Sequence, residues 1–162
     1  KDVGTIDSLW DANMDMLSVH NGIDPYDTEW PIYARTPTRP PHFTGPDAVV
    51  RHSLMTGGCV VDGEVENSVL FHSVTVEKGA KVRYSILMPG AVVKEGAEVS
   101  YAIVAEKAVI GAGAKVGAPP DPEGASEDWG IAVVAEGIKV GDGATVAPKA
   151  MVTRNVKGGA AK

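Results

Sequence analysis

Aliphatic residues recur along the middle of the chain at steps of six, six and five residues. Between residues 68 and 117 they fall at Leu70, Val76, Val82, Leu87, Val93, Val99, Val104, Ile110 and Val116. A small residue, mostly alanine or serine, stands two places before nearly every one of them. Helices bury apolar residues at steps of three and four. The spacing instead predicts the hexapeptide repeat of a parallel β-helix.

Three nearly identical heptamers set the length of one coil. VEKGAKV begins at Val76, VKEGAEV at Val93 and IGAGAKV at Ile110, each 17 residues after the last. Three hexads per coil predict a triangular prism in which these three residues form one inner column. The valines six places further on form a second column. Successive coils stack at the strand spacing of about 4.8 Å, and about five coils are expected.

One segment interrupts the repeat. Residues 118–131, APPDPEGASEDWGI, hold three prolines and cannot continue the pattern. Directly afterwards AVVAEGIKVGDGATV (132–146) matches AIVAEKAVIGAGAKV (102–116) almost letter for letter. We therefore expect a β-helix domain over 51–162, with 118–131 as a loop insertion that Trp129 either clamps onto the prism or offers to another subunit.

Residues 1–50 do not show the repeat. One helical stripe predicts a helix over 6–19 capped by Thr5; it consists of Ile6, Leu9, Trp10, Asn13 and Leu17. Six prolines then predict a linker over 23–50, with a short strand near 31–34. Its aromatic residues Tyr26, Trp30 and Phe43 are expected to pack on the prism or on another domain. The predicted fold is mainly β: a parallel β-helix preceded by one α-helix and a proline-rich linker.

Charge and cysteine content narrow the function classes. The formal net charge of −6 argues against nucleic acid, whose phosphates require a basic surface. No apolar run approaches the roughly 18 residues of a membrane span, so no membrane partner is expected. The single cysteine, Cys59, cannot form an internal disulfide, which fits a reducing cytoplasm. It occupies a small-residue position and should be a buried thiol.

Several motifs add a family resemblance. KDVGTIDSLWDANMDML, YDTEWPIY, PPHF and SLMTGGCVVDGEVENSVLF follow one another in this order. Together they resemble the C-terminal part of bacterial glucose-1-phosphate adenylyltransferases (ADP-glucose pyrophosphorylases). The resemblance covers nearly the whole chain and implies a left-handed β-helix. It also implies that residues 1–22 are the last piece of a catalytic domain. That family converts ATP and glucose 1-phosphate to ADP-glucose and pyrophosphate with Mg²⁺, in glycogen biosynthesis.

The resemblance also suggests site residues. Asp2 matches a metal-binding aspartate, expected to hold Mg²⁺ in the parent enzyme only. Lys107 falls where some members contact an anionic allosteric effector. The family's Gly-rich phosphate loop has no counterpart here, so we expect no catalytic residue, no bound cofactor and no activity in this chain alone. Because the family forms tetramers, a homo-oligomer is expected, with the catalytic domain as a further partner.

Two other interpretations remain open. The chain could be the C-terminal domain of a different sugar-1-phosphate nucleotidyltransferase. It could also be a free-standing hexapeptide acyltransferase, whose active site would need a histidine at an interface between prisms. His72 is the histidine to consider for such a role, although a surface position just past the strand of Ser68–Leu70 is the plainer expectation.

Overall fold

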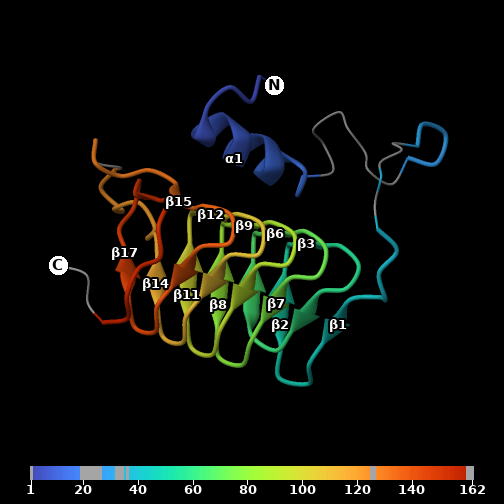
Figure 1. Cartoon of the computed structure of the whole chain (residues 1–162). Coiled ribbons are helices and arrows are strands. Elements are labelled where there is room, and N and C mark those ends of the chain that lie inside the picture. The colour runs from blue at the N-terminus through green and yellow to red at the C-terminus, as the bar shows by residue number, and fades with distance from the viewer. Residues whose placement is uncertain (1, 19–26, 32–34, 36, 125–126, 160–162) are drawn as a thin grey trace.

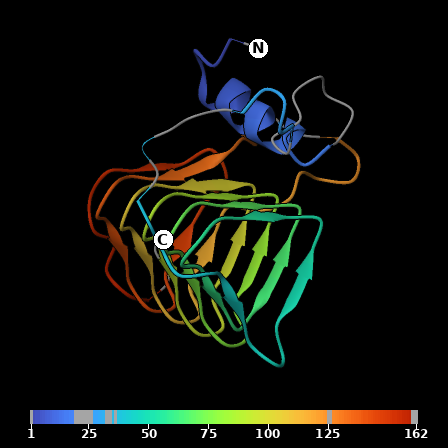
Figure 2. The ribbon, with the colours of Figure 1, turned by 90° about the vertical axis from the view of Figure 1, so that its right-hand side faces the viewer.

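The chain folds into a three-sided β-solenoid with one helix lying along it (Figure 1). The structure is a computed structural model that describes residues 2–18, 27–31, 35, 37–124 and 127–159. The described strands form three parallel sheets of six strands each, one sheet per side of the prism. Viewed from the β1 end, the coils trace one three-sided outline with the helix outside it (Figure 2). The mainly β class is confirmed, and the stacked coils are those of a left-handed β-helix of hexapeptide repeats.

The three sides of the prism are named here by their strands. The first face contains β1 (Phe43–Thr44), β4 (Val60–Val61), β7 (Thr75–Val76), β10 (Val92–Val93), β13 (Val109–Ile110) and β16 (Lys139–Val140). The second face contains β2 (Val49–Arg51), β5 (Glu64–Glu66), β8 (Lys81–Arg83), β11 (Glu98–Ser100), β14 (Lys115–Val116) and β17 (Thr145–Val146). The third face contains β3 (Leu54–Met55), β6 (Val69–Leu70), β9 (Ile86–Leu87), β12 (Ala102–Val104), β15 (Ala132–Val134) and β18 (Met151–Val152).

The strand register confirms the predicted inner columns. Val93 pairs with Val76 on one side and with Ile110 on the other, and all three are fully buried. Val99 likewise pairs with its counterparts 17 residues away on both sides. The small-residue positions are buried as well, among them Ala80, Ala91, Ala97, Ala108 and Ala114. A large side chain there would have no room beside the aliphatic columns.

The strands of the described residues make six coils, one more than the approximately five that the sequence predicts. The additional coil is the first, in which β1 and the start of β2 already lie within the segment expected to be linker. The next coil is shorter than 17 residues, because Val60 pairs with Thr75. Its tight corner depends on Gly63: a Cβ there would collide with the carbonyl oxygens of Ala80 and Glu77. This shortening hides the repeat from a search at a constant period.

Serine hydroxyls link successive coils at the corner between the second and third faces, and those of Ser68 and Ser85 are buried. Ser53, Ser68 and Ser85 form this serine ladder, in which each Oγ donates to the carbonyl two residues earlier. Each Oγ also accepts the N–H of the next coil; for Ser85 the donor is Ala102, at 3.2 Å. At Ser68 and Ser85 the hydroxyls therefore satisfy backbone groups that are shielded from water.

We expect Ser85→Ala to lower the free energy of unfolding by about 1–3 kcal/mol, because it leaves the buried N–H of Ala102 without its acceptor. Urea titration followed by circular dichroism measures this loss. Ser100→Ala, on the outer side of β11, is the matched control and should change stability by less than about 0.5 kcal/mol. Equal losses in the two variants would contradict the role of the ladder.

The outward residues differ sharply between the second and third faces. On the second face the register aligns Glu64, Lys81, Glu98 and Lys115 in a row of alternating charge. Arg83 adds ion pairs to this face, 3.2 Å from Glu64 and 3.7 Å from Glu66. On the third face the outward row is aliphatic instead: Leu54, Val69, Ile86, Ile103, Val133 and Met151. The outward residues of the second face are therefore suited to contact with solvent, whereas those of the third face are stabilised when another element packs over them.

The helix α1 (Ile6–Asp15) covers part of the third face. Its residues Ile6, Leu9, Trp10 and Met14 pack around Ile86, Ile103 and Ile131. The indole Nε1 of Trp10 donates to the carbonyl of Tyr84 at 2.8 Å, and its ring stacks on Tyr101. The helix is thus held by a hydrogen bond as well as by apolar contact.

The helix start is confirmed and its end is corrected. Thr5 is the N-cap in a capping box with Ser8, as the sequence predicts. The helix ends at Asp15 rather than at 19, because the following N–H groups bond three residues back, Leu17 to Met14 and Ser18 to Asp15. Such tighter turns close the helix while its apolar stripe continues.

The structure narrows one expectation for the linker, does not describe most of two others, and confirms one for the loop. Trp30 and Phe43 are 77% and 57% exposed, so they do not pack on the prism; Phe43 points outward from β1. Tyr26 and most of the strand expected at 31–34 lie outside the described residues. Segment 118–131 leaves the prism after β14, and pairing resumes at β15. Trp129 clamps this loop onto the prism by its edge-to-face contact with Tyr101, and its Nε1 donates to the carbonyl of Ala118 within the loop.

Candidate functional site

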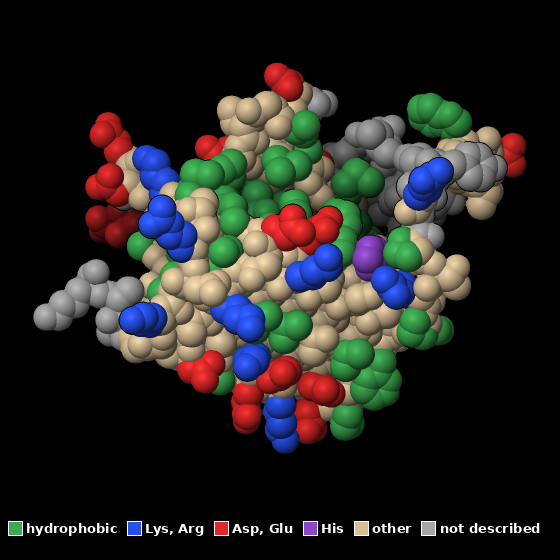
Figure 3. All heavy atoms as spheres, viewed as in Figure 1, with side chains coloured by type: hydrophobic (Ala, Val, Ile, Leu, Met, Phe, Trp, Pro, Cys, Tyr) green, Lys and Arg blue, Asp and Glu red, His purple; other side chains and the backbone are tan. Residues whose placement is uncertain are grey.

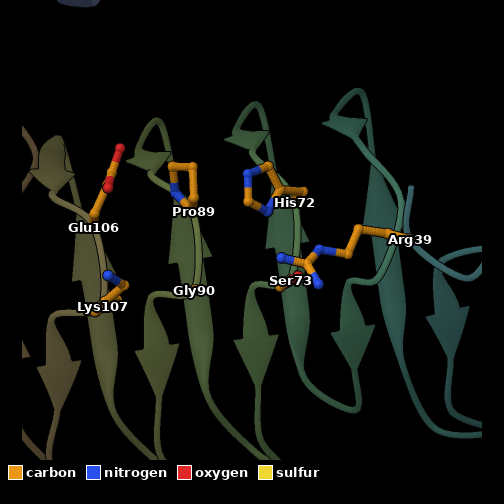
Figure 4. A pocket seen from close by; sticks show the side chains of 7 residues that line it. All are labelled: Arg39, His72, Ser73, Pro89, Gly90, Glu106 and Lys107. Carbon is orange, nitrogen blue, oxygen red and sulfur yellow. The ribbon is translucent and has the colours of Figure 1, made fainter. Parts of the chain in front are cut away.

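A hollow of about 300 Å³ lies at the corner between the third and first faces. Its lining consists of Arg39, His72, Ser73, Pro89, Gly90, Glu106 and Lys107. Figure 4 shows the side chain of Arg39 reaching along the corner toward Ser73, with Glu106 and Lys107 at the opposite end and Pro89–Gly90 between them. The hollow therefore extends over three neighbouring corners of the solenoid and has a cationic side chain at each end.

The solenoid register brings these residues together. The N–H of Gly90 donates to the carbonyl of His72, and the N–H of Lys107 donates to that of Pro89, so equivalent corners stack. Ser73, Gly90 and Lys107 all have positive φ, at 62°, 71° and 54°. Left-handed backbone is costly for a serine or a lysine. The bonds between coils hold both residues in this conformation and thereby set where the Lys107 side chain begins.

The charges of the hollow favour a small anion. Arg39 offers a planar guanidinium, and Lys107 an ammonium, both good ligands for phosphate or carboxylate oxygens. Glu106 is the acidic group in the lining and keeps the hollow from being purely cationic. His72 adds an unused group: its Nδ1 is buried and has no hydrogen-bond partner among the described residues. Charged side chains of both signs and a histidine lie in a row below α1 in the space-filling view (Figure 3).

Asp2, the residue assigned to magnesium in the parent enzyme, is an exposed carboxylate just ahead of α1. Its Oδ1 accepts the N–H of Gly4 at 3.1 Å. Within the described ranges no three His, Cys, Asp or Glu side chains gather closely enough to hold a metal ion. Magnesium prefers six oxygen ligands in octahedral geometry. The residues present do not form such a site by themselves.

Of the site residues expected from sequence, Lys107 is the one in the hollow. Sequence reasoning missed two of its neighbours. His72 was expected at the surface, yet the 17-residue register that aligns it with Pro89 and Glu106 was already visible in the sequence. No sequence pattern indicated that Arg39 belongs to the site, because its position depends on how the proline-rich segment packs against the second coil. That contact includes a hydrogen bond from the N–H of Gly58 to the carbonyl of Pro40.

Cys59 is a structural thiol. It is fully buried in the core, and its Sγ donates to the carbonyl of Phe71 at 3.1 Å. Burial raises the pKa of the Cys59 thiol, so the reactive thiolate is disfavoured. This agrees with the buried position expected from the hexapeptide pattern.

Comparison with known proteins agrees with the fold. The family described as GlmU-like, C-terminal hexapeptide matches residues 42–140, more than half of the chain. The chain is also similar to glucose-1-phosphate adenylyltransferases. The one from Clostridium perfringens (strain SM101 / Type A) is 55% identical over 83 residues, 51% of this chain and 21% of that protein. The one from Geobacillus stearothermophilus is 52% identical over 83 residues, again 51% and 21%.

The matched region thus spans about a fifth of the length of these curated relatives. The acetyltransferase domain of PglB from Neisseria gonorrhoeae FA1090 aligns over 73% of this chain and 52% of that one. Its identity is 23% and the TM-score 0.47, too low to bear on function. Among the described residues no helix is long and apolar enough to cross a membrane. By its sequence match and its stacked coils, the chain belongs to the GlmU-like C-terminal hexapeptide family.

Proposed function

We propose that this chain is the regulatory and assembly domain of a glucose-1-phosphate adenylyltransferase, an enzyme that makes ADP-glucose for glycogen synthesis. The observation that carries the regulatory part is the hollow at the corner between the third and first faces, with Arg39 and Lys107 at its ends. The similarity to glucose-1-phosphate adenylyltransferases supports the parent activity. By itself the chain is not expected to release pyrophosphate from ATP and glucose 1-phosphate.

The ligand of the hollow is a small phosphorylated or carboxylated effector. Its volume of about 300 Å³ is at the small end of the range for ligand pockets. Two cations outnumber the single carboxylate of Glu106, and the buried Nδ1 of His72 can hydrogen-bond an oxygen of the ligand. Inorganic phosphate or a sugar bisphosphate fits this combination of charge and size.

The domain also links the effector to the rest of the enzyme. Met88 directly precedes Pro89 of the hollow and packs against the cluster that holds α1 on the third face. The helix in turn follows Asp2, the expected magnesium ligand of the parent enzyme. An effector in the hollow therefore has a short packed route to the catalytic domain, which we expect as a partner in the cytoplasm together with further copies of this chain.

Phosphate binding tests the effector site. We expect isothermal titration of the chain with inorganic phosphate, and separately with fructose 1,6-bisphosphate, to show binding that Lys107→Gln and Arg39→Gln each weaken roughly tenfold, since each removes a charge-assisted hydrogen bond. Lys78→Gln removes an exposed lysine at a different corner and should leave the affinity unchanged. Absence of binding by either probe, or an equal loss in Lys78→Gln, would refute the proposal.

A further inference from the structure

The outward row of the first face is uncharged over five of its six coils. The register aligns Phe43, Val60, Thr75, Val92, Val109 and, at the C-terminal end, Lys139. Phe43 is 57% exposed and Val60 38%, and the remaining members are at least partly exposed. Hydrophobic side chains accordingly gather toward the β1 end of the side shown in Figure 3.

This row differs from the outward rows of the other two faces, because it is largely uncharged and no helix packs over it among the described residues. The second face turns alternating charges to water. On the third face α1 packs over Ile86 and Ile103 in the middle of the aliphatic row, which leaves Met151 at the C-terminal end exposed. The first face combines an apolar outward row with exposure. Contiguous exposed apolar residues on a flat sheet mark an interaction surface.

Charged residues of both signs flank the row. Glu77, Lys78, Lys94 and Glu95 lie at the corner with the second face, and Glu106 and Lys107 at the corner with the third. An apolar centre inside a polar rim is the usual anatomy of a protein interface. The absence of acidic side chains from the outward row itself matters here, because a chain of net charge −6 repels its own copies elsewhere.

We propose that the first face packs against the first face of a second copy, with the two prisms antiparallel. A two-fold axis along the strands then sets the first coil of one copy against the last coil of the other. Thr75 meets Val92, Val60 meets Val109, and the ring of Phe43 meets the ammonium of Lys139 in a cation–π contact. Parallel prisms would instead place Lys139 against Lys139, and like charges directly opposite each other are unfavourable.

The size of the face predicts a weak dimer. Six strands at about 4.8 Å separate the outer rows by roughly 24 Å, and each strand of this face is two residues long. A face of these dimensions is smaller than the roughly 800 Å² per partner of a standard interface. We therefore expect association at tens to hundreds of micromolar chain. This inference rests on the assembly role proposed above and specifies its surface; it does not depend on the effector hollow.

Sedimentation velocity of the whole chain, from roughly 10 to 300 μM, tests the surface. The unsubstituted chain should move from monomer toward dimer over this range, and Val92→Lys should remain monomeric with an unchanged circular dichroism spectrum. Thr145→Lys makes the same charge change on the exposed row of the second face and should dimerise normally. Both substitutions reduce the net negative charge, so dissociation by Val92→Lys alone is specific to the first face.

A cross-link tests the orientation. In the antiparallel dimer a chain carrying both Val60→Cys and Val109→Cys should be linked to its partner by a bismaleimide of about 10 Å, the spacing of packed sheets, whereas either single variant should not. Cys59 does not interfere, since it is buried. A monomeric unsubstituted chain, dimers in Val92→Lys, dissociation by Thr145→Lys, or efficient linking of the single variants would each overturn the proposal.

Discussion

Val99→Asp is expected to destabilise the chain by about 3–5 kcal/mol. Val99 is fully buried, and its neighbours in the column, Val82 and Val116, are apolar on both sides. A carboxylate there loses its hydration without gaining a partner. Chemical denaturation followed by circular dichroism measures the change. Because burial disfavours the ionised form of a carboxyl, the loss should be greater at about pH 8 than at about pH 4.

Ser100→Asp is the matched control for this substitution. It introduces the same carboxylate one residue later on β11, where the side chain points outward beside Arg83 in the register of the second face. Its effect should lie within about 0.5 kcal/mol. An unchanged denaturation midpoint for Val99→Asp would contradict the inner column, and a large loss for Ser100→Asp would contradict the assignment of inward and outward positions.

Gly117→Ala is the second substitution with a large expected effect. Gly117 directly follows β14 with φ of +67°, and a Cβ at this residue would collide with the carbonyl oxygen of Ser100 in the coil before it. The colliding atoms belong to the backbone, so no flexible side chain can move aside. We expect a loss of more than about 3 kcal/mol in the free energy of unfolding, measured by urea titration.

Gly96→Ala separates the collision from the conformational cost. Gly96 has nearly the same φ, +66°, but no atom lies within 4 Å of the place that the methyl group of an alanine would occupy. Its substitution should cost only the left-handed backbone strain of about 1–2 kcal/mol. If the two alanine variants are equally stable, the close approach of the Gly117 and Ser100 coils is wrong.

The hexapeptide pattern predicted the prism because inward positions must repeat at the period of the coil. Val76, Val93 and Ile110 face one interior, so the requirement for apolar side chains leaves a 17-residue signature along the chain. The same logic located the loop at 118–131, since prolines cannot supply the N–H groups that stacked coils share. This reasoning failed for the first coil, whose shortened neighbour at Gly63 breaks the constant period.

The candidate site was predictable only in part. Lys107 came from a family resemblance, and the register could have added His72 and Pro89, which occupy equivalent corners of earlier coils. Arg39 precedes the first strand and belongs to no repeat. Its guanidinium enters the hollow because the proline-rich segment crosses a particular corner, a long-range contact for which the local sequence carries no period.

The sequence by itself determined the coil: which residues face inward, where small residues and glycines permit the corners, and where the loop leaves the prism. These features depend on local spacing and are therefore written into a periodic pattern. Only the tertiary structure decided what lies outside the prism. How the non-repeating segments pack decides where α1 lies on the third face, that Arg39 lines the same hollow as Lys107, and that the first face is exposed. Such packing is set by contacts between residues far apart along the chain.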